Sequence, residues 1–141
     1  MTLAPQEVAD RVEILDLLAR YSSVVDRGAW DEMPALFTPD AVLDFSATGG
    51  ITGSVADHQE FNAKVLPGFA STQHVMGLPT VMLSGDEATS RSICFNPMVV
   101  NEQHVFFVGL WYDDQLVRTA EGWRFSSRVQ QKSYFHNFDQ R

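Results

Sequence analysis

The stretch VFFVGLWY, from Val105 to Tyr112, is apolar at both alternating positions of a strand. A strand that covers only one core alternates polar and apolar residues, so this one is expected to bury both of its faces. One face would lie against helices. The other face needs a partner, and a second copy of the chain is the simplest one. The stretch therefore predicts a central strand and a homodimer, or a higher homo-oligomer, formed through the outer face of the sheet.

Other long strands are predicted on both sides of this stretch. Glycine-containing turns at Ser84–Asp86 and Ala120–Gly122 separate them. The four predicted strands cover Ser71–Leu83, Glu87–Val100, His104–Arg118 and Trp123–Phe135.

Helical patterns dominate the first half of the chain. A long helix is predicted over Glu7–Arg27, with Pro5 at its first turn, and a short one over Asp31–Phe37. A third, Val55–Val65, begins at a capping box of Ser54 and Asp57, and a short strand covers Ala41–Phe45. Helices followed by antiparallel strands predict an α+β fold. No linker or repeat divides the chain, so residues 1–141 are predicted to form a single domain.

Composition excludes several classes of function. A net charge of −8 argues against nucleic-acid binding, which usually needs a basic patch. No apolar run is long enough to predict a membrane span, and MTLAPQEVAD at the N-terminus does not resemble a secretory signal. The single cysteine, Cys94, fits a reducing compartment, so a cytoplasmic protein is expected. No GxGxxG, P-loop or HExxH motif predicts a nucleotide or zinc site.

The helical wheel of the first helix raises a question about Asp26. This residue continues a stripe that contains Val8, Val12 and Ala19, so its carboxylate is expected on a buried face. Ile14, Leu18, Tyr21 and Val25 form a neighbouring apolar stripe. Carboxylates are disfavoured near a helix C-terminus, where the dipole is negative, so a special role for Asp26 is one interpretation. A solvated aspartate at a helix end is the alternative.

Several segments in order resemble the NTF2-like superfamily, in its SnoaL-like branch. The longest is IxDLxxRYSxxxDRGxWDxxxxLFxxDAVxDF, Ile14–Phe45, followed by TQHVMG, Thr72–Gly77. YDDQLVRT, Tyr112–Thr119, and EGWRFSSR, Glu121–Arg128, complete the match. The resemblance implies a cone in which N-terminal helices pack in a curved antiparallel sheet that encloses a pocket. It does not imply one activity, because this branch includes dehydratases, isomerases, dehydrochlorinases, cyclases, epoxide hydrolases and non-catalytic binders.

The resemblance also implies roles for three residues. In dehydratases and dehydrochlorinases of the superfamily, an aspartate on the first helix pairs with a histidine on the strand matched by TQHVMG. Asp26 and His74 stand at these positions, which makes His74 the expected base and Asp26 its orienting carboxylate. Tyr21 matches a pocket tyrosine of bile-acid dehydratases, which binds a substrate oxygen. The alternatives are a core histidine and a core tyrosine.

Other candidates are weaker. His104, Arg128 and Met76 are predicted to contact substrate, although a turn histidine, a structural arginine and a core methionine are the alternatives. Asp114 is expected to make a structural contact with backbone or with an arginine. A metal triad of Asp26, His74 and His104 has no supporting ligand spacing, so neither metal nor cofactor is predicted. His58 and His136 match no motif and are expected at the surface.

Two functions follow from these residues. The first is a cofactor-independent lyase or isomerase, dehydratase-like, that removes a proton from carbon in a small hydrophobic ring compound. The second is a non-catalytic module that binds a small ligand in the same pocket. The distance between His74 and Asp26 separates the two, because an enzyme needs these side chains within hydrogen-bond reach.

Overall fold

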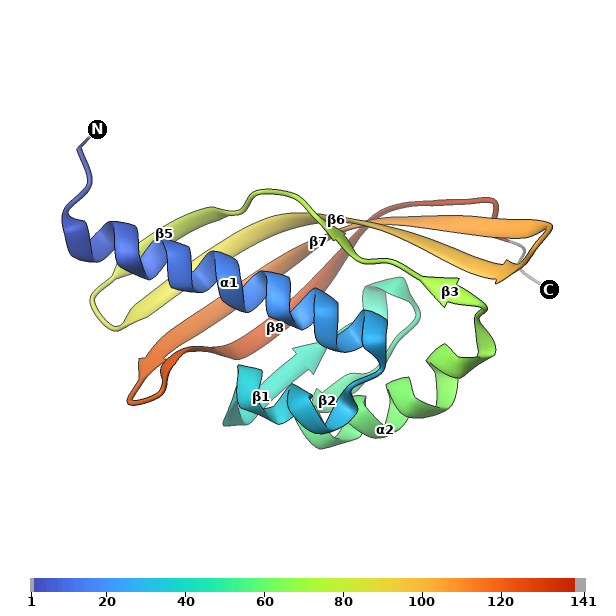
Figure 1. Cartoon of the computed structure of the whole chain (residues 1–141), viewed down its shortest axis with the longest axis horizontal. Coiled ribbons are helices and arrows are strands. Elements are labelled where there is room, and N and C mark those ends of the chain that lie inside the picture. The colour runs from blue at the N-terminus through green and yellow to red at the C-terminus, as the bar shows by residue number, and fades with distance from the viewer. Residues whose placement is uncertain (1, 139–141) are drawn as a thin grey trace.

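The computed structural model describes residues 2–138, which form helices packed against one mixed sheet (Figure 1). The helical segments are α1 (Pro5–Arg27), η1 (Trp30–Leu36), η2 (Ser46–Thr48), α2 (Val55–Val65) and η3 (Leu66–Gly68). The strands are β1 (Phe37–Asp44), β2 (Thr52–Ser54), β3 (Ser71–Thr72), β4 (Val75–Met76), β5 (Thr80–Ser84), β6 (Glu87–Asn101), β7 (His104–Thr119) and β8 (Gly122–His136). Within these residues, no helix is long and apolar enough to cross a membrane.

The sheet is built on three long antiparallel strands, β6, β7 and β8. Its order is β2-β1-β8-β7-β6-β3, and β4 and β5 also pair with β6. The predicted α+β cone is confirmed, with one difference in pairing: β1 runs parallel to β8. Parallel neighbours need a long connection, and here most of the chain lies between the two strands.

Helix α1 lies across the face of this sheet (Figure 1). Its ends follow local sequence rules, since Pro5 stands in the first turn and Gly28 closes the helix with φ of 65°. The side chains of Ile14, Leu18, Tyr21 and Val25 are buried, as predicted for their stripe.

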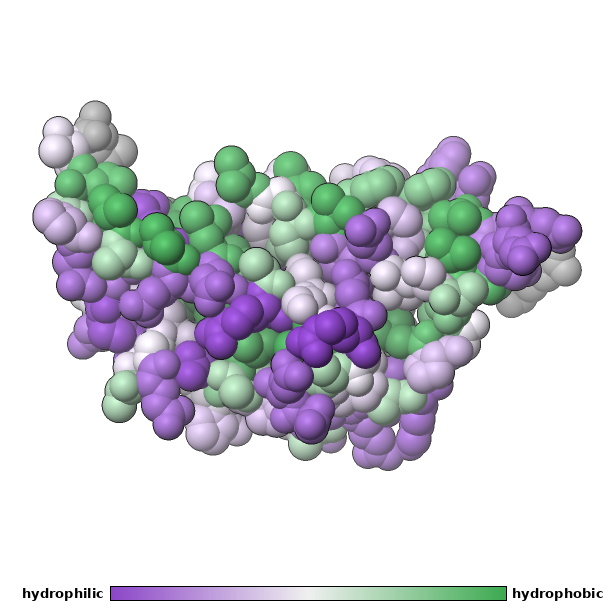
Figure 2. Space-filling view, viewed as in Figure 1, coloured by the Kyte–Doolittle hydropathy of each residue, from purple (hydrophilic) through white to green (hydrophobic). Residues whose placement is uncertain are grey.

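The neighbouring stripe of α1 was predicted to be buried, and this prediction is wrong. Val8 is 47% exposed and Val12 58% exposed, and Figure 2 shows apolar residues along this side of the helix. The sheet contacts only one face of α1, so the wide apolar arc exceeds the surface that covers it. Burial of this stripe therefore does not explain why an aspartate stands at position 26, near the C-terminus of α1.

The strand predicted over Ser71–Leu83 is divided into β3, β4 and β5. The segments between them contain His74 and, farther on, Gly77 and Pro79. Proline lacks the N–H that a ladder needs, and glycine weakens a strand, so the second break follows from composition. The first break leaves the backbone N–H of His74 outside the ladder.

Helix α2 forms the wall of the cone opposite the sheet. Its predicted capping box is confirmed: the Ser54 hydroxyl accepts from the Asp57 N–H, and the Asp57 carboxylate accepts from the Ser54 N–H. The surface position predicted for His58 is wrong. This side chain is fully buried, with Nε2 3.1 Å from the Leu43 carbonyl, because it lies on the face of α2 that packs against β1.

Candidate functional site

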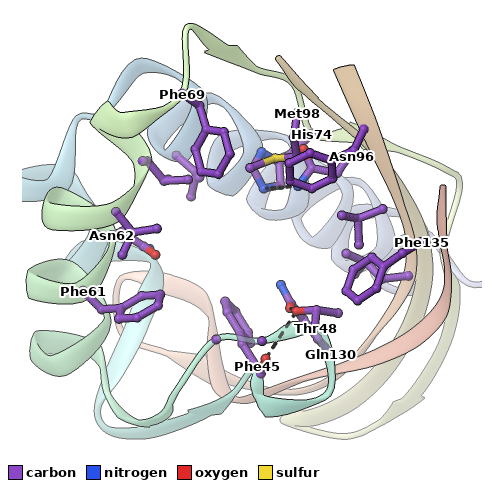
Figure 3. Close-up of a pocket in the computed structure, with 18 of the residues that line it drawn as sticks. Phe45, Thr48, Phe61, Asn62, Phe69, His74, Asn96, Met98, Gln130 and Phe135 are labelled. Atoms are coloured by element: carbon purple, nitrogen blue, oxygen red, sulfur yellow. Dashed lines mark hydrogen bonds between the residues drawn. The ribbon is translucent and has the colours of Figure 1, made fainter. Parts of the chain in front are cut away.

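A cavity of about 280 Å³ lies between α2, the last turns of α1 and the inner face of the sheet (Figure 3). Its lining is mostly apolar, and polar side chains enter it at a few points. The aromatic side chains that line it include Phe45, Phe61, Phe69, Phe106 and Phe135. Such a mixture of apolar walls and few polar groups is typical of a small-molecule site.

His74 and Asp26 meet at one end of this cavity. His74 Nδ1 lies 2.6 Å from Asp26 Oδ1, and the backbone N–H of His74 donates to Asp26 Oδ2 at 2.9 Å. The His74 side chain is 8% exposed and lines the cavity, whereas the Asp26 side chain is 24% exposed and lies behind it. Both carboxylate oxygens therefore bind the same residue, which fixes the imidazole in position and tautomer.

The division of the predicted strand explains how this contact forms. Because His74 lies between β3 and β4, its backbone N–H is free to donate to a side chain instead of a neighbouring strand. The β4 segment passes beside α1, so the last turn of the helix brings Asp26 to it. Asp26 reaches His74 from the edge of α1 and not from a buried stripe.

Tyr21 lines the cavity from α1 and is 1% exposed. Burial raises the pKa of Tyr21 to about 12, although the Arg128 cation opposes this rise. The phenol therefore stays protonated at neutral pH and can donate a hydrogen bond. Its ring lies edge-on to that of Tyr112, with 5.9 Å between the ring centroids.

Arg128 does not line the cavity, in contrast to the prediction that it contacts substrate. Its guanidinium is buried behind the pocket wall, 4.1 Å from the Tyr21 ring centroid and 3.7 Å from that of Tyr112. Arg128 Nε is 3.1 Å from Asp114 Oδ1, and both side chains are fully buried. Burial raises the pKa of Asp114 to about 6, which Arg128 opposes. This pair supports the tyrosines from behind.

His104 and Met76 also lie outside the cavity lining. His104, at the start of β7, places its Nε2 2.9 Å from the Asn137 carbonyl. Met76 packs against the core from β4. Among residues 2–138, no group of three histidine, cysteine or acidic side chains lies close enough to hold a metal ion, so Asp26, His74 and His104 do not assemble as a triad.

Four polar residues of the cavity are missed by the sequence analysis: Thr48, Asn62, Asn96 and Gln130. Asn96 Nδ2 lies 3.3 Å from His74 Nε2, and Gln130 Nε2 donates to the Tyr112 hydroxyl at 3.1 Å. A signal for two of them exists in the strand pattern. Asn96 and Gln130 are polar residues at inward positions of β6 and β8, where alternation predicts apolar ones.

The arrangement suits proton transfer. With Nδ1–H donated to Asp26, His74 presents the lone pair of Nε2 to the cavity, next to Asn96. A carboxylate–imidazole pair can take a proton and stabilise the resulting imidazolium. Tyr21 supplies a hydrogen-bond donor in the same cavity.

Comparison with known proteins agrees with this architecture. The uncharacterised protein Rv2910c of Mycobacterium tuberculosis is 45% identical over 134 residues, covering 94% of this chain and 91% of that protein. The crystal structure of the Kfla4162 protein from Kribbella flavida superposes with a TM-score of 0.84 at 28% identity, over 93% of this chain and 95% of that one.

A second solved structure, a hexachlorocyclohexane dehydrochlorinase from Novosphingobium barchaimii, has the same fold, with a TM-score of 0.82 at 17% identity over 96% of this chain and 94% of that one. The model of the SnoaL-like domain matches residues 6–129. The fold, the cavity and this match agree, and the chain therefore belongs to the SnoaL-like family.

Proposed function

We propose that this protein is a cofactor-independent lyase or isomerase that acts on a small hydrophobic ring compound. The observation that carries the proposal is the hydrogen bond between His74 Nδ1 and Asp26 Oδ1, in a histidine that lines a largely apolar cavity. SnoaL-like domains form a family of small-molecule lyase- and isomerase-like proteins, and a dehydrochlorinase is among the structural neighbours. A pure binding module would not require this fixed base.

In the proposed reaction, His74 Nε2 removes a proton from a carbon of the ring. The electrons of the C–H bond form a carbon–carbon double bond as a leaving group departs from the adjacent carbon. In an isomerisation, they instead move toward a carbonyl, and the proton returns at another carbon. Asp26 stabilises the imidazolium, and Tyr21 donates to the oxygen that gains charge.

The outer face of the sheet supports a proposal about assembly. Ile93 is 49% exposed, Phe95 38% and Tyr134 46%, and all three lie on this face of β6 and β8. An exposed apolar patch on a sheet is typical of an interface. We therefore propose that two or more copies associate through it.

The dyad is tested by turnover. A panel of hydroxylated and ketonic ring compounds would be screened with product detection by mass. On a substrate found in this way, His74→Ala and Asp26→Asn are each expected to lower kcat by about 10²–10⁴. Matched controls are His136→Ala and Asp40→Asn, which change exposed residues outside the cavity. Unchanged turnover in both dyad variants would exclude the proposed mechanism.

A further inference from the structure

Two hydrogen bonds to Asp26 hold His74 in one orientation. Asp26 Oδ1 lies 2.6 Å from Nδ1 of the ring, and Asp26 Oδ2 accepts from the backbone N–H of His74 at 2.9 Å. A carboxylate accepts and cannot donate, so Nδ1 carries a hydrogen whether the ring is neutral or protonated. Any change in the protonation of His74 therefore takes place at Nε2, and the neighbour of Nε2 has to adapt to it.

That neighbour is Asn96 on β6, whose Nδ2 lies 3.3 Å from Nε2 (Figure 3). The amide N–H donates to the lone pair of the neutral ring. When the ring is protonated, Nε2 carries a hydrogen as well, so two donors face each other. The same amide also has an acceptor, Oδ1, and a half-turn about the Cβ–Cγ bond exchanges the places of Oδ1 and Nδ2.

The amide oxygen makes no bond that such a half-turn would break. Asn96 is 8% exposed, and its Oδ1 is buried without a hydrogen-bond partner among residues 2–138. An unpaired buried oxygen is unfavourable. After a half-turn, Oδ1 would accept from the Nε2–H of the protonated ring, in a charge-assisted bond roughly twice as strong as a neutral one. The protonation of His74 thus decides which orientation of the amide is favoured.

Asp26, from α1, is the charged group in contact with the His74 ring. Three buried titratable side chains near the dyad are neutral, because burial raises the pKa of each of them: Cys94 on β6 and Tyr21 on α1 to about 12, and Tyr112 on β7. The Arg128 guanidinium lies behind the two tyrosines and is paired with Asp114. A proton on Nε2 is therefore matched by Asp26 at one ring nitrogen and by Asn96 at the other.

We propose that Asn96 is a positioning residue whose side-chain amide makes a half-turn with each proton transfer at His74. In the resting site, the Nδ2–H of Asn96 covers the lone pair of Nε2. This bond has to open before Nε2 can take a proton from carbon, because Nε2 has a single lone pair. After the transfer, Oδ1 accepts from the new Nε2–H and stabilises the imidazolium.

The inference rests on the proposed function in taking His74 as the base, and it adds a gate to that base. A carboxylate at position 96 would only accept and would oppose the lone pair of the neutral ring. An ammonium group would only donate and would oppose the imidazolium. An amide combines a donor and an acceptor on one rotating bond, so it matches both states of His74.

NMR spectroscopy of the unaltered full chain, labelled with ¹⁵N, tests the half-turn without a substrate. The ring nitrogen signals report the protonation of His74, and nuclear Overhauser contacts report which end of the amide faces Nε2. Contacts between the Asn96 amide hydrogens and the ring hydrogens that flank Nε2 are expected while the ring is neutral. They are expected to disappear when the ring is protonated. The same contacts in both states would overturn the proposal.

The variant Asn96→Leu gives a second test, in which the sign of the effect separates a fixed amide from a rotating one. A fixed N–H donor favours the neutral ring, so its loss would make His74 bind a proton more tightly. A rotating amide favours the protonated ring, because the charge-assisted bond is the stronger one. Its loss is therefore expected to weaken proton binding about fivefold, measured from the ring signals across a pH titration.

Asn62→Leu is the matched control, because Asn62 is another nearly buried amide of the cavity, on α2, and should leave the titration of His74 unchanged. Tighter or unchanged proton binding in Asn96→Leu, or an equal effect in Asn62→Leu, would count against the proposal. Failure of the proposed function is measured separately. Unchanged turnover in His74→Ala would contradict His74 as the base and leave the response of the amide to protonation in place.

Discussion

Among single residues, His58 gives the clearest dependence of stability on pH. Burial lowers the pKa of this histidine below its ordinary 6.5, so the folded state holds it neutral. The unfolded chain binds a proton more readily, and the free energy of unfolding is therefore expected to decrease as the pH falls through 6.5 toward the folded pKa. Thermal unfolding at a series of pH values measures this loss.

The control for this prediction is a comparison of variants, because Asp114 acts in the opposite direction. Its pKa is raised from 3.8 to about 6, so its contribution to stability decreases as the pH rises through that range. His58→Gln keeps a donor for the Leu43 carbonyl and removes the titration. His136→Gln, at an exposed histidine, is the control variant. If the free energy of unfolding of His58→Gln depended on pH in the same way as that of the unaltered chain, the role of His58 would be contradicted.

At the scale of elements, the packing of β7 against β8 depends on Gly109. A Cβ atom at this position would lie 2.1 Å from Tyr134 Cε1, because the tyrosine ring covers the glycine across the strands. Gly109→Ala must displace this ring and is expected to lower the free energy of unfolding by about 1–3 kcal/mol in urea denaturation. Adding Tyr134→Ala should recover part of the loss, and an additive effect of the two changes would show that the ring is not the obstacle.

Element order, the capping box of α2 and the glycine turns could be read from the sequence, because each depends on neighbouring residues. The buried face of α1 could not be predicted from the sequence. Its apolar arc is wider than the surface that the sheet covers, so the helical pattern alone does not say which part of the arc is buried. The roles of Asp26, His74 and Tyr21 were predicted from the resemblance to a family. The role of Asn96 could not be predicted, because it depends on the pairing of β6 with the segment around His74, which only strand register reveals.

For the whole molecule, the apolar outer face predicts self-association. Light scattering after size exclusion is expected to give a mass of at least two chains, and Ile93→Lys should shift it toward one, because a lysine there places a charge in the proposed interface. Val12→Lys is the matched control on the exposed side of α1 and should leave the mass unchanged. A single-chain mass for the unaltered protein would refute the interface.

The origin of the cavity walls has a consequence for how the protein can diversify. His74 lies between β3 and β4, Asn96 on β6 and Gln130 on β8. Phe61 and Asn62 lie on α2. The groups proposed to handle the proton are thus carried by α1 and the strand side of the cavity, whereas α2 supplies another part of its wall. Substitutions confined to α2 can remodel the contour of the accepted molecule while the proton-handling groups keep their places, so new substrates are accessible in small mutational steps.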